Sequence, residues 1–226
     1  MAESWLILET SGRVAKVGLA RCGAVVRATQ LDDTRRHARD LAPTVTAMLD
    51  AESLRPADLT GVMASRGPGS YTGLRVGLVS AKALAYAVGC KLVALDTFAA
   101  IAEQTPAETD QVWVIADALQ GQVYVQGFAR VAGGWSAADS LRIVSFEDWL
   151  PHAGEKWVSG PGLGAYADRI PEECRLVAQA DREPRVESVF AAGARLEALS
   201  REELFALEPL YLRGSSAEEK AKREGK

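Results

Sequence analysis

A glycine-rich turn, GPGSYTG at residues 67–73, stands between an apolar run and a long stretch with helical periodicity. Such a turn can hold a phosphate group, because free backbone N–H groups and the positive end of the helix dipole meet there. The residues of this candidate phosphate or nucleotide loop are Gly67, Gly69, Ser70 and Thr72. A P-loop also needs a lysine after its last glycine, and Leu74 occupies that position. We therefore favour a strand-to-helix turn with Ser70 or Thr72 as N-cap, and the phosphate site is the alternative.

Two carboxylates, Glu9 and Asp117, end similar apolar runs in the two halves of the chain. The segment WVIADALQGQVYVQGFA at 113–129 echoes WLILETSGRVAKVGLA at 5–20, and the echo places Asp117 over Glu9. A repeat at this period predicts two related subdomains side by side, with chance similarity of two hairpins as the alternative. We expect the two strand-end carboxylates to face each other across a cleft.

Metal ligands and partners for a nucleophile are scarce in this sequence. The chain has two histidines, His37 and His152, far apart, and three cysteines without a Cys-x-x-Cys pair. This composition predicts no zinc clip, no disulfide framework and no serine or cysteine nucleophile beside a histidine. We therefore expect no metal site and no catalytic residue.

Composition and charge narrow the class of protein. With 48% hydrophobic and 25% charged residues, the 226-residue chain can build a real core. Its formal charge of −4 gives no basic field for binding nucleic acid by itself. The N-terminal MAESWLILETS lacks a basic n-region, and no apolar run reaches membrane-spanning length. We expect a cytoplasmic protein without a membrane partner.

Turn residues and hydrophobic periodicity predict the order β-β-β-α-β-α-β-α for the first half. The expected strands cover 5–9, 14–20, 24–31, 59–65 and the start of 91–104. The expected helices cover 35–52, Leu74 to Val88 and the end of 91–104, the last capped near Asp96 or Thr97. Pro43 should delay or kink the first helix, and Gly89 should end the second. The second half repeats the pattern more loosely, with GPGLGAY at 160–166 after an expected strand.

Several segments together resemble the TsaB (YeaZ) family, and they extend from Leu6 to Arg213. They are ILETS, RRHARDLAP, SRGPGSYTGLRVGLVSAKALA, ADALQGQVYVQGF and EPLYLR. Their layout resembles the actin, sugar-kinase and Hsp70 (ASKHA) superfamily. The resemblance implies an α/β fold of duplicated β-β-β-α-β-α subdomains, at residues 1–105 and 106–213, the second degenerate. Residues 214–226 form a charged tail that we expect to be disordered.

The resemblance implies a non-catalytic paralogue that dimerises with and activates TsaD, the transferase that makes threonylcarbamoyladenosine beside the tRNA anticodon. It also implies the ATPase TsaE as a second partner and contact with tRNA only through the complex. No cofactor belongs to the chain itself, and ATP or ADP with Mg²⁺ is restricted to the complex. Whether the isolated chain is a monomer or a homodimer stays open.

Two other functions compete with this one. In the superfamily, carboxylates at the first strand ends position metal and water, so an ATP-hydrolysing enzyme of the sugar-kinase fold is the alternative. Two features weaken the ATP-hydrolysing alternative: the lysine of a P-loop is missing, and Glu9 stands where the resembled family has Asp. They favour a solvated or N–H-binding role for Glu9 and Asp117. A metal-dependent glycoprotease fits less well, since Thr97 and Ile101 replace the His-x-x-x-His pair of the catalytic paralogues.

A stripe of small residues follows the glycine turn, because Gly73, Gly77, Ala81 and Ala85 recur every four positions. Glycine inside a helix costs about 1 kcal/mol relative to alanine, so Gly77 indicates close approach of another element. That element is either the chain's own sheet or a partner helix, and the resembled family, which pairs through this helix and the preceding one, favours the partner. The expected interface is Leu41, Val45, Met48, Gly73, Leu74, Gly77, Leu78, Ala81, Leu84 and Ala85.

Overall fold

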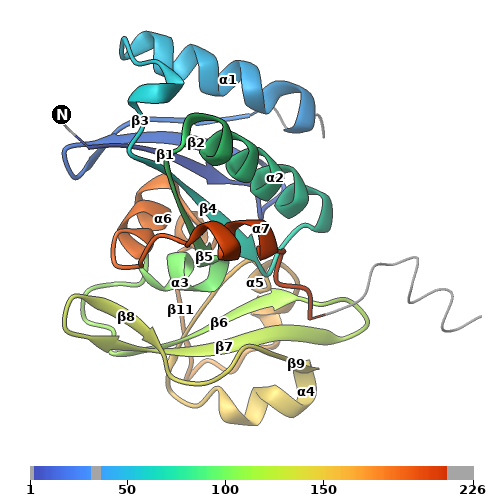
Figure 1. The fold of residues 1–226 in the computed structure, drawn as a ribbon. Helices are drawn as coiled ribbons and strands as arrows, with labels where there is room; N and C mark the ends of the chain where they lie inside the picture. The colour runs from blue at the N-terminus through green and yellow to red at the C-terminus, as the bar shows by residue number, and fades with distance from the viewer. Residues whose placement is uncertain (1–2, 32–36, 213–226) are drawn as a thin grey trace, which may run out of the picture.

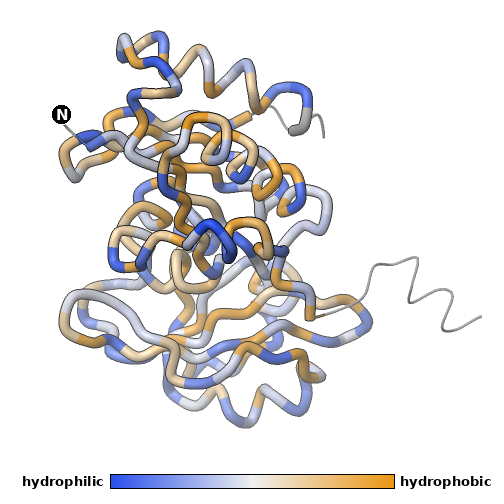
Figure 2. The backbone as a smooth tube through the Cα atoms, viewed as in Figure 1, coloured by the Kyte–Doolittle hydropathy of each residue, from blue (hydrophilic) through white to orange (hydrophobic). Residues whose placement is uncertain are grey.

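The computed structural model describes residues 3–31 and 37–212, and the tail expected at 214–226 lies outside these residues. The described chain forms two stacked β-sheets with helices above, between and below them (Figure 1). Figure 2 shows hydrophobic residues along the strands of both sheets and hydrophilic residues on the short helix α7, Arg201–Ala206. No helix in the described ranges is long and apolar enough to cross a bilayer.

The first sheet has the strand order β3-β2-β1-β4-β5. Its strands are β1 Ser4–Glu9, β2 Lys16–Arg21, β3 Ala24–Gln30, β4 Gly61–Gly67 and β5 Lys91–Asp96. β1, β2 and β3 are antiparallel neighbours, whereas β4 and β5 run parallel to β1. Apolar residues fill the buried strands β1, β2 and β4, which is why short apolar runs between turn residues predicted them.

The second sheet repeats this connectivity with the order β8-β7-β6-β10-β11. Its strands are β6 Gln111–Asp117, β7 Gln122–Val131, β8 Gly134–Ala137, β9 Arg142–Ser145, β10 Trp157–Ser159 and β11 Arg175–Leu176. Antiparallel β6, β7 and β8 are followed by parallel β10 and β11, and β9 pairs with β7 beside this path. The echo in the sequence is thus confirmed as a structural repeat, and with it the duplicated α/β fold of the ASKHA type.

Helices cover both outer faces and fill the space between the sheets. They are α1 His37–Ala51, α2 Tyr71–Val88, α3 Thr97–Ala102, α4 Phe146–Trp149, α5 Leu163–Tyr166, α6 Val186–Gly193 and α7. α1 and α2 pack on the outer face of the first sheet, and α4 and α5 on that of the second. Short 3₁₀ turns lie at Pro56–Asp58, Leu150–His152, Ala167–Arg169 and Gln179–Asp181.

Between the sheets, α3 and α6 lie side by side, and each contacts the sheet of the other half (Figure 1). Phe98 of α3 packs with Val112 of β6. Val189 of α6 packs with Ile7 and Met63 of the first sheet. A helix from the second half thereby completes the core of the first, and the expected boundary between residues 105 and 106 stays a prediction.

The start of α2 differs from the expectation, whereas its end agrees. α2 begins at Tyr71 rather than Leu74, because the Ser70 hydroxyl accepts a hydrogen bond from the Gly73 N–H at 3.2 Å and caps the helix. Gly89 ends it in the left-handed region at a φ of 71°. The glycine turn is therefore shorter than its sequence suggests, and Thr72 lies within the helix.

The start of α1 also differs from the expectation. α1 begins at His37, so Pro43 lies inside the helix. Of the two expected effects of Pro43, the late start is wrong and the kink stays a prediction. Pro43 is exposed there, so water can satisfy the backbone carbonyl that its missing N–H leaves without a helical partner.

Candidate functional site

A pocket of about 460 Å³ opens between the two halves of the molecule. The first half contributes the loop after β1, the glycine turn and α3, and the second half contributes the end of β6 and two later loops. The pocket brings together Gly69, Ser70 and Asp117 from the expected site residues. Arg13 and Glu183 add charges of both signs, so the wall carries no strong field for a polyanion. The remaining residues of the candidate loop lie outside its wall, namely Gly67 and Thr72.

Glu9, the last residue of β1, is buried, with 1% of its surface exposed. Its Oε1 accepts hydrogen bonds from the Ser11 N–H at 2.7 Å and from the Ser11 hydroxyl, and its Oε2 accepts one from the Ser65 hydroxyl. Burial raises the pKa of Glu9, and the hydrogen bonds and the charge of Lys16 oppose that rise. The side chain ties the ends of β1 and β4 together, so the expectation that it faces the cleft is wrong.

Asp117 ends β6, in the place that matches Glu9, and it is exposed on the pocket wall. Its Oδ1 accepts hydrogen bonds from the Leu119 N–H at 2.8 Å and from the Tyr166 hydroxyl at 3.3 Å. Burial, and then the charge and hydrogen bond of Asp117, raise the pKa of Tyr166. The two strand-end carboxylates therefore differ. Glu9 is buried and joins two strand ends, whereas Asp117 accepts a hydrogen bond within a turn and is exposed to solvent.

Two backbone N–H groups of the glycine turn have partners inside the chain. The Ser70 N–H donates to the Ser11 carbonyl at 2.7 Å, the Gly73 N–H to the Ser70 hydroxyl and the Leu74 N–H to the Ser70 carbonyl. A Cβ on Gly69 would lie 2.5 Å from the Ser11 carbonyl oxygen, so glycine is needed for the two loops to touch. These contacts favour a strand-to-helix turn, because two of its N–H donors are engaged within the chain and the Ser70 hydroxyl caps the helix.

Potential metal ligands are dispersed. Within residues 3–31 and 37–212, no group of three or more His, Cys, Asp or Glu side chains is placed to hold a metal ion. Thr97 and Ile101, at the positions of the expected histidine pair, are buried on α3. The pocket wall thus offers the hydroxyl groups of Ser11, Ser70 and Thr97 and a few isolated charges.

The stripe of small residues on α2 faces the chain's own sheet. A Cβ on Gly77 would lie 2.1 Å from the Thr10 hydroxyl oxygen, and one on Gly73 would lie 2.1 Å from the Thr10 carbonyl oxygen. The alanines of the stripe are also buried, since Ala81 is 0% and Ala85 2% exposed. The other expected interface residues are also buried or partly buried. Leu74 is 1% exposed, and the rest belong to the core under α1 and α2: Leu41, Val45, Met48, Leu78 and Leu84. Docking of a partner on this stripe is therefore wrong, and close packing on the sheet explains Gly77.

The opposite face of α2 carries exposed apolar side chains that the sequence analysis missed. Val79 is 64% and Tyr86 58% exposed. The C-terminal segment runs beside them, because the Phe205 ring packs 5.6 Å from the Tyr86 ring and Lys82 donates to the Phe205 carbonyl. We call this surface the α2–α7 face and define it by Tyr71, Val79, Tyr86, Phe205 and Tyr211. The seven-residue spacing of Val79 and Tyr86, two helical turns, was the available signal.

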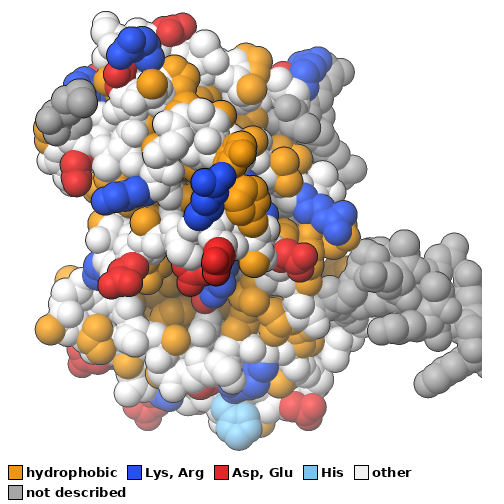
Figure 3. Space-filling view, viewed as in Figure 1, with side chains coloured by type: hydrophobic (Ala, Val, Ile, Leu, Met, Phe, Trp, Pro, Cys, Tyr) orange, Lys and Arg blue, Asp and Glu red, His pale blue; other side chains and the backbone are white. Residues whose placement is uncertain are grey.

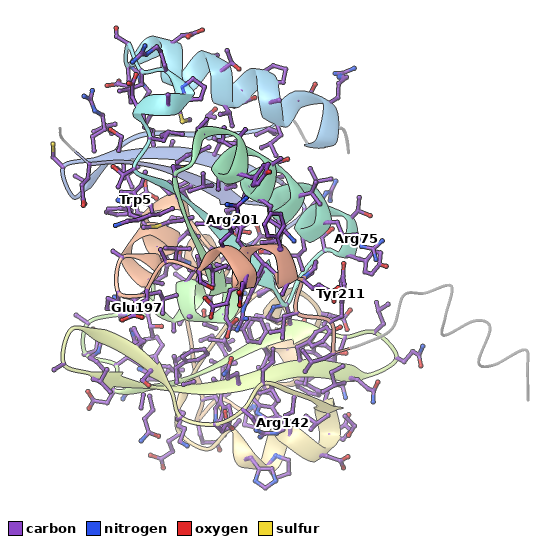
Figure 4. All side chains as sticks on the ribbon, viewed as in Figure 1. Trp5, Arg75, Arg142, Glu197, Arg201 and Tyr211 are labelled. Atoms are coloured by element: carbon purple, nitrogen blue, oxygen red, sulfur yellow. The ribbon has the colours of Figure 1, made fainter. Side chains whose placement is uncertain are left out.

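Arginines flank the α2–α7 face. The Arg201 guanidinium lies 5.8 Å from the Tyr86 ring centre, and the Arg75 guanidinium lies 4.1 Å from that of Tyr71. Arg75 also donates to the Tyr211 hydroxyl at 2.8 Å, which fixes the end of the described chain against α2 (Figure 4). Figure 3 shows hydrophobic side chains gathered there beside Lys and Arg side chains. Exposed aromatic and arginine residues around an apolar centre are typical of protein–protein interfaces.

Comparisons with known proteins agree on one family. The family model described as TsaD, tRNA N6-adenosine threonylcarbamoyltransferase, matches residues 31–163. The threonylcarbamoyladenosine biosynthesis protein TsaB of Bacillus subtilis is 28% identical over 151 residues, which span 67% of this chain and 66% of that protein. TsaB of Escherichia coli is 26% identical over 94% of this chain and 95% of its own length. The structure of YeaZ from Pseudomonas aeruginosa, 25% identical, superposes with a TM-score of 0.75 over 93% of this chain and all of the other.

Proposed function

Because the chain belongs to the TsaD family, and within it to the TsaB/YeaZ branch, we propose that it is a non-catalytic subunit in tRNA threonylcarbamoyladenosine biosynthesis. In this role it dimerises with a TsaD-like transferase and activates threonylcarbamoyl transfer to the adenosine beside the tRNA anticodon. A TsaE-like ATPase joins the complex, and tRNA contacts this chain only through the complex. ATP or ADP with Mg²⁺ belongs to the assembled complex, and the chain has no cofactor of its own.

The environment of Glu9 is the observation that carries the non-catalytic part of this proposal. A carboxylate that positions metal or water must present at least one oxygen to them. Both oxygens of Glu9 accept hydrogen bonds from Ser11 or Ser65, and the group is buried. Its role is therefore to hold strand ends together, and the activity of the complex comes from the partner.

The α2–α7 face supplies the docking surface in this proposal, in place of the buried stripe. Val79, Tyr86 and Phe205 are exposed together at the middle and C-terminal end of α2. Burying such side chains against a partner removes apolar area from water, and Arg75 and Arg201 at the rim can pair with acidic groups. The longest helix of the first half thus packs on its own sheet with one face and is free to meet a partner with the other.

A negative charge introduced on this face tests the proposed function. Val79→Glu places a carboxylate at the centre of the face, whereas Val131→Glu makes the same change at a 49% exposed valine of the second sheet. We expect Val79→Glu to weaken the affinity for the TsaD-like subunit at least about tenfold, which is 1.4 kcal/mol, and Val131→Glu to leave it within about twofold. Calorimetric titration measures the affinity, and threonylcarbamoyl transfer at limiting concentration should fall with it. Equal affinity and transfer for the two variants would contradict docking through this face.

A further inference from the structure

The outer edge of β3 is open. β3 ends the first sheet and pairs with β2, and no other strand in the described ranges pairs with its far side. All but one of its seven residues are exposed. In an antiparallel strand, alternate residues point their N–H and C=O groups away from the neighbour, so this edge presents a row of backbone groups to an added strand.

A groove of about 600 Å³ runs between this edge and α1. The strand side of the groove includes Arg27 and Thr29, and the helix side includes Thr44, Ala47 and Met48. These side chains are small, β-branched or flexible, and they leave room for apolar side chains of moderate size. A groove with backbone hydrogen-bonding groups on one side and an apolar helix on the other is the geometry in which extended peptides add to a sheet.

Positive charge lies beside the first half of β3, where the side chain of its central residue Arg27 meets Arg21 at Glu52. Arg27 donates to one oxygen of Glu52 at 2.6 Å, and Arg21, opposite Ala24 in the sheet, donates to the other at 3.3 Å. Two guanidinium groups therefore share one carboxylate. The cluster keeps a net positive charge that an acidic group can neutralise.

We propose that this groove binds an extended peptide segment of a partner protein, which pairs antiparallel with β3 and adds a sixth strand to the first sheet. Alternate side chains of the segment, small or β-branched, lie against α1. Because the C-terminal end of an antiparallel segment lies beside the start of β3, an acidic side chain there meets Arg21 and Arg27. Antiparallel pairing continues the order of β1, β2 and β3 and is the slightly more stable arrangement.

Charge favours a foreign segment over a second copy of this chain. Arg27 is the central residue of the seven in β3. β3 contains no acidic residue, so pairing it with its own copy adds a second Arg27 and supplies no carboxylate to the arginine pair. A segment with an acidic side chain instead pairs a carboxylate with the arginines, so this edge of the sheet favours such a segment over a second copy of β3.

The probe for this proposal is a blocked peptide, acetyl-Thr-Val-Thr-Val-Thr-Val-Glu-amide, titrated into the isotope-labelled full chain and followed by backbone amide shifts. We expect shifts confined to residues 24–30 and to the groove side of α1. The same peptide with Lys in place of Glu should bind at least about threefold more weakly, because it meets the arginine pair with like charge. A peptide methylated on every backbone nitrogen should not bind, because neither of its edges can donate to the ladder. Shifts elsewhere, none at all, or unchanged binding of the methylated peptide would overturn the proposal.

A pair of lysine substitutions on α1 provides the matched control. Ala47 lines the groove, whereas Ala42 is exposed on the same helix and outside the groove lining. Ala47→Lys should weaken the peptide at least about tenfold and Ala42→Lys by less than about twofold. Equal effects would overturn the proposal. So would sedimentation that shows a dimer of the free chain which Val26→Lys dissociates, because a second copy then occupies the edge.

Discussion

The two halves of the molecule share one strand order but differ in the helices on their outer faces. α1 and α2 have 15 and 18 residues, whereas α4 and α5 have four residues each. The short helices carry the buried Phe146, Trp149, Leu163 and Tyr166, which suffice to cover the second sheet. The helices of the first half are longer than covering a sheet requires, so they expose an additional face to solvent. The difference teaches that the helices of the first half extend beyond what its core needs, and the surfaces that we propose for partners lie on this half together with Phe205 and Tyr211 of the C-terminal segment.

The turns that launch the matching helices α2 and α5 show how this difference arises. Both contain Gly-Pro-Gly, and Gly67 and Gly160 both have positive φ, at 122° and 106°. In the first half, Ser70 then caps α2 with its hydroxyl. In the second half, Gly162 stands at the N-cap and makes no side-chain hydrogen bond. Glycine in place of a serine N-cap costs about a few tenths of a kcal/mol, which slightly favours a shorter helix in the second half.

The largest effect we predict concerns the contact between the halves. Phe98→Ala removes a fully buried ring of α3 that packs on β6, and should lower the free energy of unfolding by about 3–5 kcal/mol. Phe205→Ala makes the same change at a 56% exposed ring and should cost less than about 1 kcal/mol. Urea unfolding measures both. A cost for Phe98→Ala as small as that of Phe205→Ala would break the account in which α3 joins the two sheets.

The next effect contrasts the matching helices directly. Gly77→Ala forces a methyl group to 2.1 Å from the Thr10 hydroxyl oxygen and should destabilise the chain by about 1–3 kcal/mol despite the better helix propensity of alanine. Gly164→Ala in α5 meets no atom within 4 Å and should raise stability by up to about 1 kcal/mol. Thermal unfolding of the two variants gives the sign of each change. Stabilisation by Gly77→Ala would show that α2 does not sit as close to β1 as described.

The smallest effect concerns Glu9 and pH. Because burial raises its pKa above the usual 4.5, the folded chain holds the Glu9 proton at pH values where the unfolded chain has released it. The stabilisation that the Glu9 proton gives to the folded chain is therefore fully present below pH 4.5. It is lost as pH rises through the raised pKa of Glu9 in the folded chain. Glu9→Gln cannot ionise, keeps an oxygen for Ser11 and should flatten this slope. Denaturant unfolding from pH 4 to 8 measures it, and identical slopes for wild type and Glu9→Gln would show that the buried carboxyl is not the cause.

Much of the first half can be predicted from its sequence, because its signals are local. Apolar runs between glycines identify the strands, and Gly89 identifies the end of α2 through its left-handed backbone. The echo of Glu9 in Asp117 predicts the repeat, since each residue ends the first strand of its sheet. Local patterns suffice here because the spacing of apolar residues follows from the backbone geometry of the strand or helix that contains them.

Other features escape prediction because they depend on contacts between distant segments. A stripe of small residues such as Gly73 to Ala85 shows that another element packs closely against α2. Its period does not show whether that element is Thr10 of the same chain or a partner protein. The return of α6 to the first sheet likewise depends on Val189 meeting Met63, more than a hundred residues away. The burial of Glu9 follows from Ser65 on another strand, so its strand-end position alone suggested a cleft residue.

One measurement tests the central claim most directly, namely threonylcarbamoyl transfer to tRNA by TsaD-like and TsaE-like subunits with and without this chain. The double variant Glu9→Gln/Asp117→Asn keeps the shapes of both strand-end side chains and removes both carboxylates. Our account predicts that transfer rises when the wild-type chain is added, and that the double variant supports it within about threefold, since a catalytic carboxylate commonly contributes about a hundredfold or more. Transfer reduced a hundredfold by the double variant in a complex that still assembles would contradict the account, because the chain would then supply catalytic groups of its own.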